Sequence, residues 1–225
     1  MIIFYGFCFL FFAVMFCGVK FLSLNIFGKS ICKIKNPSNI YLTFDDGPNP
    51  NLTPKVLDLL AKYKQKATFF CIAKNAEKYP EIVRRIVAEG HTLGSHDLHH
   101  HWTSNFRLTK KMTAEIGESV RILEEISGVK IKFYRPPVGL SNPHLFAALK
   151  KLNLQCVGWS KSVCDNGNRN VRAIKKIPNL ARKLKAGDII LLHDNAPARN
   201  EDLFLLKLEK SLENIVKSGK KSAGI

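Results

Sequence analysis

Residues 40–48, Ile-Tyr-Leu-Thr-Phe-Asp-Asp-Gly-Pro, form the stretch around which the rest of the chain is organised. Its apolar and β-branched residues are typical of a buried strand, which ends in two adjacent carboxylates and a Gly-Pro turn. Neighbouring side chains on a strand face opposite ways, so Asp45 and Asp46 can share one site only where the strand gives way to a loop. Two such carboxylates can divide the work, one binding a metal and the other moving a proton. The alternative is a solvated turn.

The composition predicts one catalytic domain with a terminal appendage. The chain has 225 residues, and a hydrophobic content of 46% is ample for a buried core. Lys and Arg total 35 against 18 Asp and Glu, and the formal charge of +17 suggests anionic surroundings. The densest basic run, residues 169–185, is interpreted as a solvated helix face. No nucleic-acid partner is expected, because no recognition motif accompanies the charge. The irregularly spaced cysteines indicate neither a disulfide framework nor a metal site.

Residues 1–19 predict a membrane-inserting segment. They contain no charged side chain, and their number is close to what a bilayer core requires. A cleavable signal peptide would show a basic start and small residues at a cut site, so an uncleaved anchor over residues 1–22 is favoured. A linker is expected at 23–38 and the globular domain at 39–225. Because the lysines lie after the apolar segment, the positive-inside rule would keep this domain in the cytoplasm.

Beyond residue 39 the sequence alternates between strand and helix patterns. The expected helices are 53–64, 80–89, 109–127, 143–151, 171–185 and 202–217, and the expected strands are 67–72, 91–95, 131–134, 154–159 and 188–192. Thr53 is the expected cap of the first helix, and Pro178 interrupts the fifth. Repeated βα units imply a parallel sheet or barrel covered by helices, with functional groups on loops at the strands' carboxyl ends. The tail 218–225 has little apolar content, so no closing strand is expected.

A histidine cluster follows the third strand of the domain, in the run Ser-His-Asp-Leu-His-His-His at 95–101. His96 and His100 are four residues apart, a spacing that predicts two imidazoles on one side of a helical turn, able to bind one metal. His99 and His101 are rival ligands. A surface cluster without a ligand role is the alternative interpretation.

Two further strand ends carry polar groups. Arg135 lies in the stiff loop Tyr-Arg-Pro-Pro-Val-Gly, where its guanidinium can hold Asp45 as an anion. His193, in the run Leu-Leu-His-Asp, can titrate near neutrality as a proton donor, and Asp165 is a candidate partner that raises its basicity. Each residue alone has a structural interpretation, as a surface ion pair, a core histidine or a turn residue. Together, such groups at successive strand ends indicate a catalytic site.

These motifs resemble those of the polysaccharide deacetylases of the NodB-homology type, carbohydrate esterase family 4. The resemblance extends over roughly residues 39–217 and implies a distorted (β/α) barrel of parallel strands covered by helices, here preceded by the membrane-inserting helix. It also implies that the site holds one divalent metal ion, usually zinc. The implied roles are general base for Asp45, metal ligands for Asp46, His96 and His100, orientation of the base for Arg135, general acid for His193 and tuning of that acid for Asp165.

The resemblance also implies a substrate groove. Its expected lining residues are Pro137, Val138, Gly139, Trp159 and Leu191, and the backbone N–H of Val138 is expected to help hold the oxyanion. Three features depart from the family pattern. Asp97 follows His96 where Ser or Thr is common, which would add a negative charge beside the metal. Val138 stands where an aromatic residue is frequent, and the fourth motif, around Asp165, is loosely matched.

The resemblance implies metal-dependent removal of N-acetyl groups from amino sugars of the N-acetylglucosamine type, in a glycan or glycolipid, with release of acetate. Two alternatives stay open: an O-acetyl esterase or other linear-amide hydrolase on the same site, and a catalytically silent, membrane-tethered glycan-binding module. The expected partners are the acetylated glycan and a membrane, contacted through residues 1–19 by a monomeric chain. The family favours a single-pass protein with an extracytoplasmic catalytic domain, in disagreement with the positive-inside rule.

Overall fold

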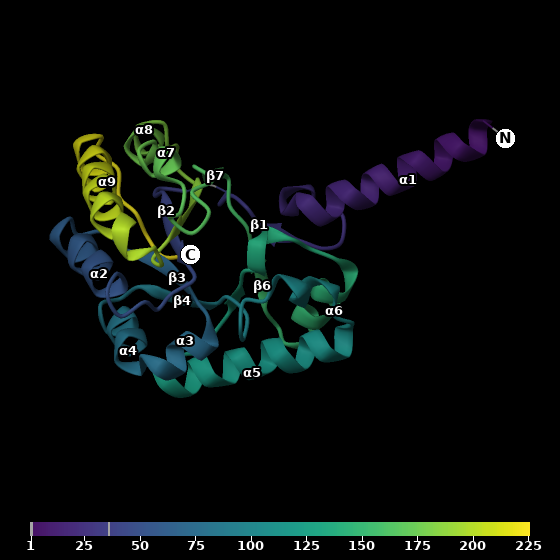
Figure 1. Cartoon of the computed structure of the whole chain (residues 1–225), viewed down its shortest axis with the longest axis horizontal. Helices are drawn as coiled ribbons and strands as arrows, with labels where there is room; N and C mark the ends of the chain where they lie inside the picture. Colours follow the sequence, from purple (N-terminus) through teal and green to yellow (C-terminus); the bar gives the residue numbers. More distant parts are fainter. Residues whose placement is uncertain (1, 36) are drawn as a thin grey trace.

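The computed structural model describes residues 2–35 and 37–225, and for residues 2–9, 11 and 102 it describes the backbone only. Within this part of the chain, eight parallel strands form one sheet in the order β1-β6-β5-β4-β3-β2-β8-β7. Figure 1 shows the arrangement of the chain around this sheet. The strands are β1 (Ser30–Ile31), β2 (Tyr41–Asp45), β3 (Ala67–Cys71), β4 (Thr92–Ser95), β5 (Phe133–Tyr134), β6 (Gln155–Val157), β7 (Lys161–Ser162) and β8 (Ile189–His193). The predicted parallel βα architecture is therefore confirmed.

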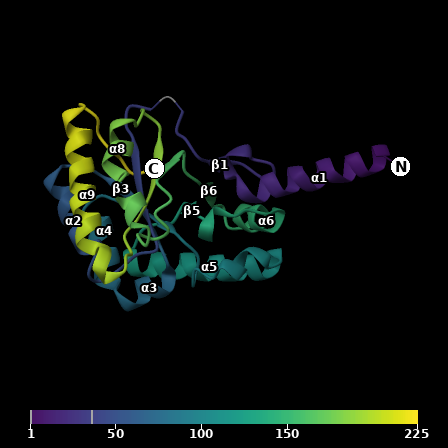
Figure 2. The same ribbon diagram turned by 45° about the horizontal axis from the view of Figure 1, so that its top comes forward.

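Helices cover the outside of the sheet, whereas α1 extends away from it (Figures 1 and 2). The α-helices are α1 (Ile2–Lys20), α2 (Thr53–Lys62), α3 (Ala73–Lys78), α4 (Pro80–Ala88), α5 (Thr109–Ser127), α6 (Pro143–Lys151), α7 (Val171–Ile174), α8 (Ile177–Arg182) and α9 (Ala198–Lys217). Short 3-10 turns form η1 (Leu22–Leu24), η2 (Trp102–Phe106) and η3 (Pro137–Gly139).

Helices with strong local signals lie where the sequence predicts them. Helix α5 ends at Gly128, whose left-handed φ of 72° stops the helix. Helix α6 begins at Pro143 after Asn142, whose side chain accepts a hydrogen bond of 2.8 Å from the backbone N–H of Leu145. The helix predicted at 171–185 is split into α7 and α8, because Pro178 lies in the first turn of a new helix.

The predicted cap of α2 is wrong. Thr53 is the first helical residue, and the capping position belongs to Leu52, which makes no side-chain capping bond. The Thr53 hydroxyl instead accepts from the backbone N–H of Asn49 at 2.8 Å and donates to the Asp194 carboxylate at 2.6 Å. Thr53 therefore fastens the turn after β2 to the turn after β8.

The predicted linker 23–38 contributes a strand to the sheet. Strand β1 pairs with β6 through Ser30 opposite Cys156 and Ile31 opposite Val157. The sheet therefore begins before residue 39, where we placed the start of the globular domain. At the other end of the chain, the tail forms no strand, as expected, but Ser222 makes an isolated bridge with Ile40.

Side chains along β2 point alternately to the two faces of the sheet, one apolar and one polar. Leu42 lies among apolar side chains of α8 and α9, and the ring of Phe44 stacks on Phe69 with centroids 5.1 Å apart. Thr43 and Asp45 point to the opposite, concave side, where both meet the guanidinium of Arg135. One face of the strand thus builds the core while the other builds a polar interior.

Helix α1 contacts the domain at its carboxyl end. Ser141, in the loop after η3, donates from its backbone N–H to the Val19 carbonyl at 3.0 Å and from its hydroxyl to the Gly18 carbonyl at 2.8 Å. Within the described part of the chain, no helix is both long and apolar enough to cross a membrane. The side chains of 1–9 and 11 lie outside the described residues, so the anchor predicted over 1–22 stays a prediction.

Candidate active site

The carboxyl ends of β2, β4 and β8 and the loops after β5 to β7 surround a cleft of about 350 Å³. Chain segments that are far apart in sequence meet here because the strands are parallel and end at the same edge of the sheet. The predicted site residues that line the cleft are Asp45, Asp46, His96, His100, Val138, Gly139, Trp159, Asp165, Leu191 and His193.

The turn after β2 brings the two adjacent carboxylates to one site. Asp45 is the last residue of β2, and Asp46 has a left-handed φ of 74°. This turn keeps both side chains at the cleft, as the sequence predicts. The turn is fixed by Asn75, whose side-chain amide donates to the Asp46 carbonyl at 3.1 Å, and by Gly47, where a β-carbon would collide with the Asp194 carboxylate.

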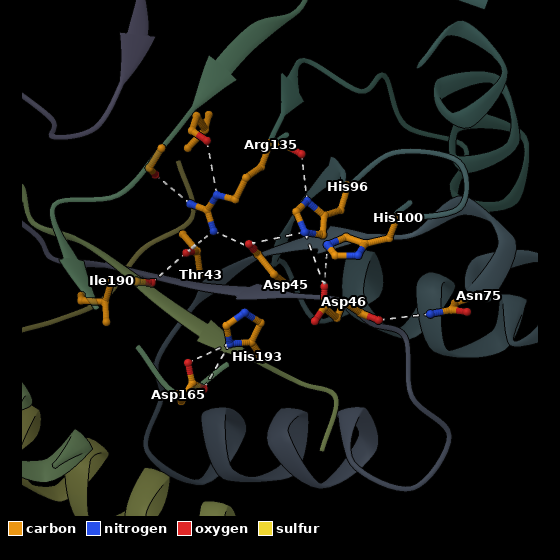
Figure 3. A network of polar contacts seen from close by, with 12 residues as sticks. Thr43, Asp45, Asp46, Asn75, His96, His100, Arg135, Asp165, Ile190 and His193 are labelled. Atoms are coloured by element: carbon orange, nitrogen blue, oxygen red, sulfur yellow. Dashed lines mark hydrogen bonds and ion pairs between the residues drawn. The ribbon is translucent and has the colours of Figure 1, made fainter. Parts of the chain in front are cut away.

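Asp46, His96 and His100 converge on one point. Their candidate ligand atoms all lie within 4.8 Å of one another. Nε2 of His96 is 3.5 Å and Nε2 of His100 is 3.3 Å from Oδ1 of Asp46. Figure 3 shows both imidazoles next to this carboxylate. The structure brings the predicted pair of histidines together, but the expected helical turn is wrong: the segment is a loop in which Asp97 and His100 have φ values of 73° and 58°.

The three side chains fit a divalent metal ion. Oδ1 of Asp46 is buried, and no described residue offers it a hydrogen bond. Nδ1 of His96 lies 2.8 Å from the Arg135 carbonyl, which can only accept, so Nδ1 carries the proton and Nε2 keeps its lone pair for a metal. Burial alone would raise the pKa of Asp46, but the imidazoles of His96, His193 and His100 hold that pKa well below its usual range. A carboxylate with two imidazoles suits zinc and related ions.

Arg135 is buried directly beneath the cleft and holds Asp45. Its Nη1 donates to Oδ1 of Asp45 at 2.6 Å and to the Thr43 hydroxyl at 2.7 Å. Nε donates to the Val157 carbonyl at 3.3 Å, and Nη2 to the Gly158 carbonyl at 2.9 Å. With its guanidinium donors engaged in this way, Arg135 keeps one oxygen of Asp45 fixed and leaves Oδ2 facing the cleft.

His193 ends β8 with Asp165 behind it. Nδ1 of His193 is 3.0 Å from Oδ1 and 3.1 Å from Oδ2 of Asp165. Figure 3 shows the imidazole between Asp165 and the carboxylates of Asp45 and Asp46. Burial alone would lower the pKa of His193, but the hydrogen bond and charge of Asp165, with the charges of Asp45 and Asp46, raise it to about 9. The ring therefore carries a proton at neutral pH.

The loop after β5 forms one wall of the cleft. Val138 has a left-handed φ of 53°, unusual for a β-branched residue, and is 58% exposed. Gly139 packs under Trp159, whose ring would collide with any β-carbon there. Pro137, which we expect to line the groove, is not among the residues that line the cleft, where Pro136 lies instead.

The Asp97 carboxylate points away from the ligand cluster, although its negative charge still acts on His100 and favours the protonated form of that imidazole. The left-handed backbone of Asp97 turns the buried carboxylate toward Ser104, whose hydroxyl donates to Oδ2 at 2.9 Å. His99 and His101, the rival ligands, have rings 5.6 Å apart and lie outside the described ligand cluster.

The loop after β7 contributes residues that the sequence did not single out. Asn166, Gly167 and Arg169 line the cleft beside Asp165. The only signal for them is the Gly- and Asn-rich run around Gly167, which marks a turn and not its direction.

The fold and the site match known deacetylases. The family model described as "Polysaccharide deacetylase" matches residues 33–157. The chain is 36% identical over 186 residues to the peptidoglycan-N-acetylglucosamine deacetylase of Bacillus cereus, covering 82% of this chain and 84% of the relative. It is 34% identical over 176 residues to the chitooligosaccharide deacetylase of Azorhizobium caulinodans, covering 77% of this chain and 82% of the relative.

Solved structures agree. The fold matches the peptidoglycan deacetylase PdaC from Bacillus subtilis, named a peptidoglycan-N-acetylmuramic acid deacetylase, with a TM-score of 0.73, 29% identity, and coverage of 84% of this chain and 89% of that chain. A family 4 carbohydrate esterase pseudoenzyme from Bacillus anthracis has the same fold at a TM-score of 0.74 and 18% identity, covering 86% of this chain and 66% of that chain. Because a pseudoenzyme shares the fold, the fold alone does not establish activity. The family match and the enzyme relatives together show that the chain belongs to the polysaccharide deacetylases of carbohydrate esterase family 4, amide-bond hydrolases that deacetylate amino sugars.

Proposed function

We propose that the protein is a metal-dependent deacetylase that removes N-acetyl groups from residues of the N-acetylglucosamine type, in a cell-wall glycan or a glycolipid, and releases acetate. The observation that carries this proposal is the convergence of Asp46, His96 and His100 beside Asp45, with His193 on the neighbouring strand. The relatives named above act on peptidoglycan and chitooligosaccharides, which supports an amino-sugar glycan as the substrate. Retention of the full set of polar residues argues against a silent binding module.

Asp45 is the proposed general base. Its Oδ1 is occupied by Arg135, while Oδ2 lies 3.7 Å from Nε2 of His96, on the side of the ligand cluster. A divalent ion held by Asp46, His96 and His100 would lower the pKa of a water and polarise the acetyl carbonyl. From its position, Oδ2 of Asp45 can take the proton of the attacking water.

His193 is the proposed general acid. Its imidazole is protonated at neutral pH, and Asp165 engages Nδ1, so Nε2 is the atom that gives its proton to the departing amine. The backbone N–H of Val138, which belongs to the wall of the cleft, is proposed to stabilise the developing oxyanion. Base and acid thus act from two adjacent strands.

The two adjacent carboxylates allow a matched test. Asp46→Ala removes a metal ligand, so we expect it to abolish both bound zinc, measured by elemental analysis, and acetate release from chito-oligosaccharides and peptidoglycan. Asp45→Asn leaves the ligands in place and keeps a side-chain oxygen that can accept from Arg135, so bound zinc should persist while turnover falls by roughly 10²–10⁴. Asp58→Asn, on the exposed face of α2, is the control and should change neither quantity.

Wild-type acetate release by both active-site variants would contradict the proposal. A chelator should stop turnover of the wild-type protein, and added zinc should restore it. Parallel assays on O-acetylated glycans distinguish the esterase alternative, which requires faster release from esters than from amides.

The acid assignment predicts a pH dependence. Because the pKa of His193 is raised to about 9, the protonated acid is lost only as the pH rises through about 9. Asp165→Asn removes the negative charge that favours the imidazolium, so this pKa falls. The alkaline limb of kcat/KM against pH should therefore move to lower pH, by roughly one to two pH units. An alkaline limb that stays in place in the variant would exclude His193 as the acid paired with Asp165.

We also propose that residues 1–22 anchor the protein as a single-pass segment with its catalytic domain outside the cytoplasm. Support comes from the uncharged sequence of 1–19, from outward-facing Leu10 and Phe16, which are 60% and 63% exposed, and from the location of peptidoglycan outside the cytoplasmic membrane. Wall polymer would then lie within reach of the tethered cleft.

Cys164 offers a test of sidedness because it is a free, exposed thiol. A membrane-impermeant maleimide should label the protein in intact cells, and Cys164→Ser should lose that label. Labelling only after the membrane is opened would place the domain in the cytoplasm. Recovery of the protein in the soluble fraction would contradict the anchor.

A further inference from the structure

The loop after β7 carries Arg169, a cation that the proposed mechanism does not use, and places it beside the ligand cluster. Arg169 lines the catalytic cleft and also a second hollow, whose other lining residues include Asn195 and Pro197. Asp46 and His100 belong to both hollows. The two hollows therefore adjoin at the ligand cluster, and Arg169 stands where they meet.

Gly167 opens the space between this cation and the ligand cluster. A β-carbon at Gly167 would lie 3.5 Å from Oδ2 of Asp46 and 3.8 Å from Nη1 of Arg169. Its φ of +60° also favours glycine. The guanidinium and the metal-site carboxylate thus border the same gap, which the absence of a side chain keeps open.

The backbone that carries Arg169 is held in place. The side-chain amide of Asn168, a fully buried residue, donates to the His193 carbonyl at 2.7 Å and to the Asn195 carbonyl at 3.2 Å. Asn200 donates in turn to the Asn168 carbonyl at 2.8 Å. The exposed Arg169 next to it makes no ion pair with any described residue, so its guanidinium donors are available at the cleft.

A cation in this position would attract an anionic group of a substrate in the cleft. A divalent ion on Asp46, His96 and His100 would repel the Arg169 guanidinium across the gap. A substrate carboxylate lying between them would be attracted by both, and guanidinium groups bind carboxylates through two parallel hydrogen bonds. In wall glycans without stem peptides, muramic acid carries a lactyl ether on the ring carbon next to the one that bears the acetamido group, and this lactyl group ends in a free carboxylate.

We propose that Arg169 binds the free carboxylate of a muramic acid residue, either the sugar that loses its acetyl group or its neighbour, and so makes the cleft selective for peptide-free, muramic-acid-containing chains over neutral chito-oligosaccharides. This inference rests on the proposed deacetylase function and adds a specificity-determining residue to it.

The test compares acetate release from three substrates: a neutral chitotetraose, a peptide-free tetrasaccharide of alternating N-acetylglucosamine and N-acetylmuramic acid, and the same tetrasaccharide with its carboxylates converted to methyl amides. For Arg169→Gln we expect kcat/KM on the anionic substrate to fall roughly ten- to hundred-fold, mainly through KM. Rates on the two neutral substrates should stay within about two-fold, since they make no such hydrogen bond.

Two further variants sharpen the comparison. Arg169→Lys should recover part of the preference for the anionic substrate, because lysine keeps the positive charge but lacks the paired N–H donors of the guanidinium. Arg172→Gln removes a neighbouring exposed cation that does not line the cleft and should leave the preference intact. Mass analysis of the product shows which sugar is deacetylated and thus which carboxylate Arg169 meets.

An equal loss of kcat/KM on all three substrates in Arg169→Gln would show a structural role for Arg169. An unchanged kcat/KM on the anionic substrate would show that Arg169 has no role in binding it. Either result overturns the inference while leaving the deacetylase function intact. Absence of acetate release from every substrate by the wild-type protein would overturn the proposed function, and this inference with it.

Discussion

The site depends on one buried ion pair, between Arg135 and Asp45. The guanidinium is fully buried, and a charge in that position is destabilising unless its hydrogen-bonding capacity is met. The guanidinium donates its hydrogen bonds to Asp45, Thr43 and the carbonyls of Val157 and Gly158. Its central carbon also lies 4.1 Å from the centroid of the Phe70 ring. Removing one partner of such a pair costs about 3–5 kcal/mol. The same residue holds Nδ1 of His96 through its carbonyl, so Arg135 fixes the base and one metal ligand together.

Strand register carries this constraint across the sheet. Asp45 on β2 lies opposite His193 on β8, and Ser95 on β4 lies opposite Tyr134 on β5. The first pairing sets the base beside the acid, while the second sets His96 beside Arg135. A shift of one residue in either pairing would turn these side chains to the other face of the sheet. The chemistry is therefore built into the hydrogen-bonding pattern of the parallel strands.

The sequence predicted those features that depend on local signals. Helices α5 and α6 match their predicted bounds because Gly128 and Pro143 mark their ends, and the paired carboxylates were recognised because a hydrophobic strand ends at them. Features that depend on tertiary contacts were missed. The two-residue strand β7 is too short to show periodicity, and the linker residues of β1 become a strand only by pairing with β6.

The least predictable parts of the site are those in which the backbone conformation of a loop determines where the side chains point. His96 and His100 converge through left-handed residues in a loop and not through a helical turn, and Asp97 turns away for the same reason. Arg169 likewise directly follows the buried Asn168, whose hydrogen bonds to the His193 and Asn195 carbonyls no spacing rule identifies. These conformations are costly for residues other than glycine and are maintained by the hydrogen bonds around them.

Anomalous diffraction at the zinc edge, from crystals of the zinc-loaded protein, tests the central claim most directly. The account predicts one strong peak at about 2.0–2.2 Å from Oδ1 of Asp46 and Nε2 of His96 and His100, with Asp45 outside bonding distance. A peak held instead by His99 or His101, or by Asp45, would contradict it.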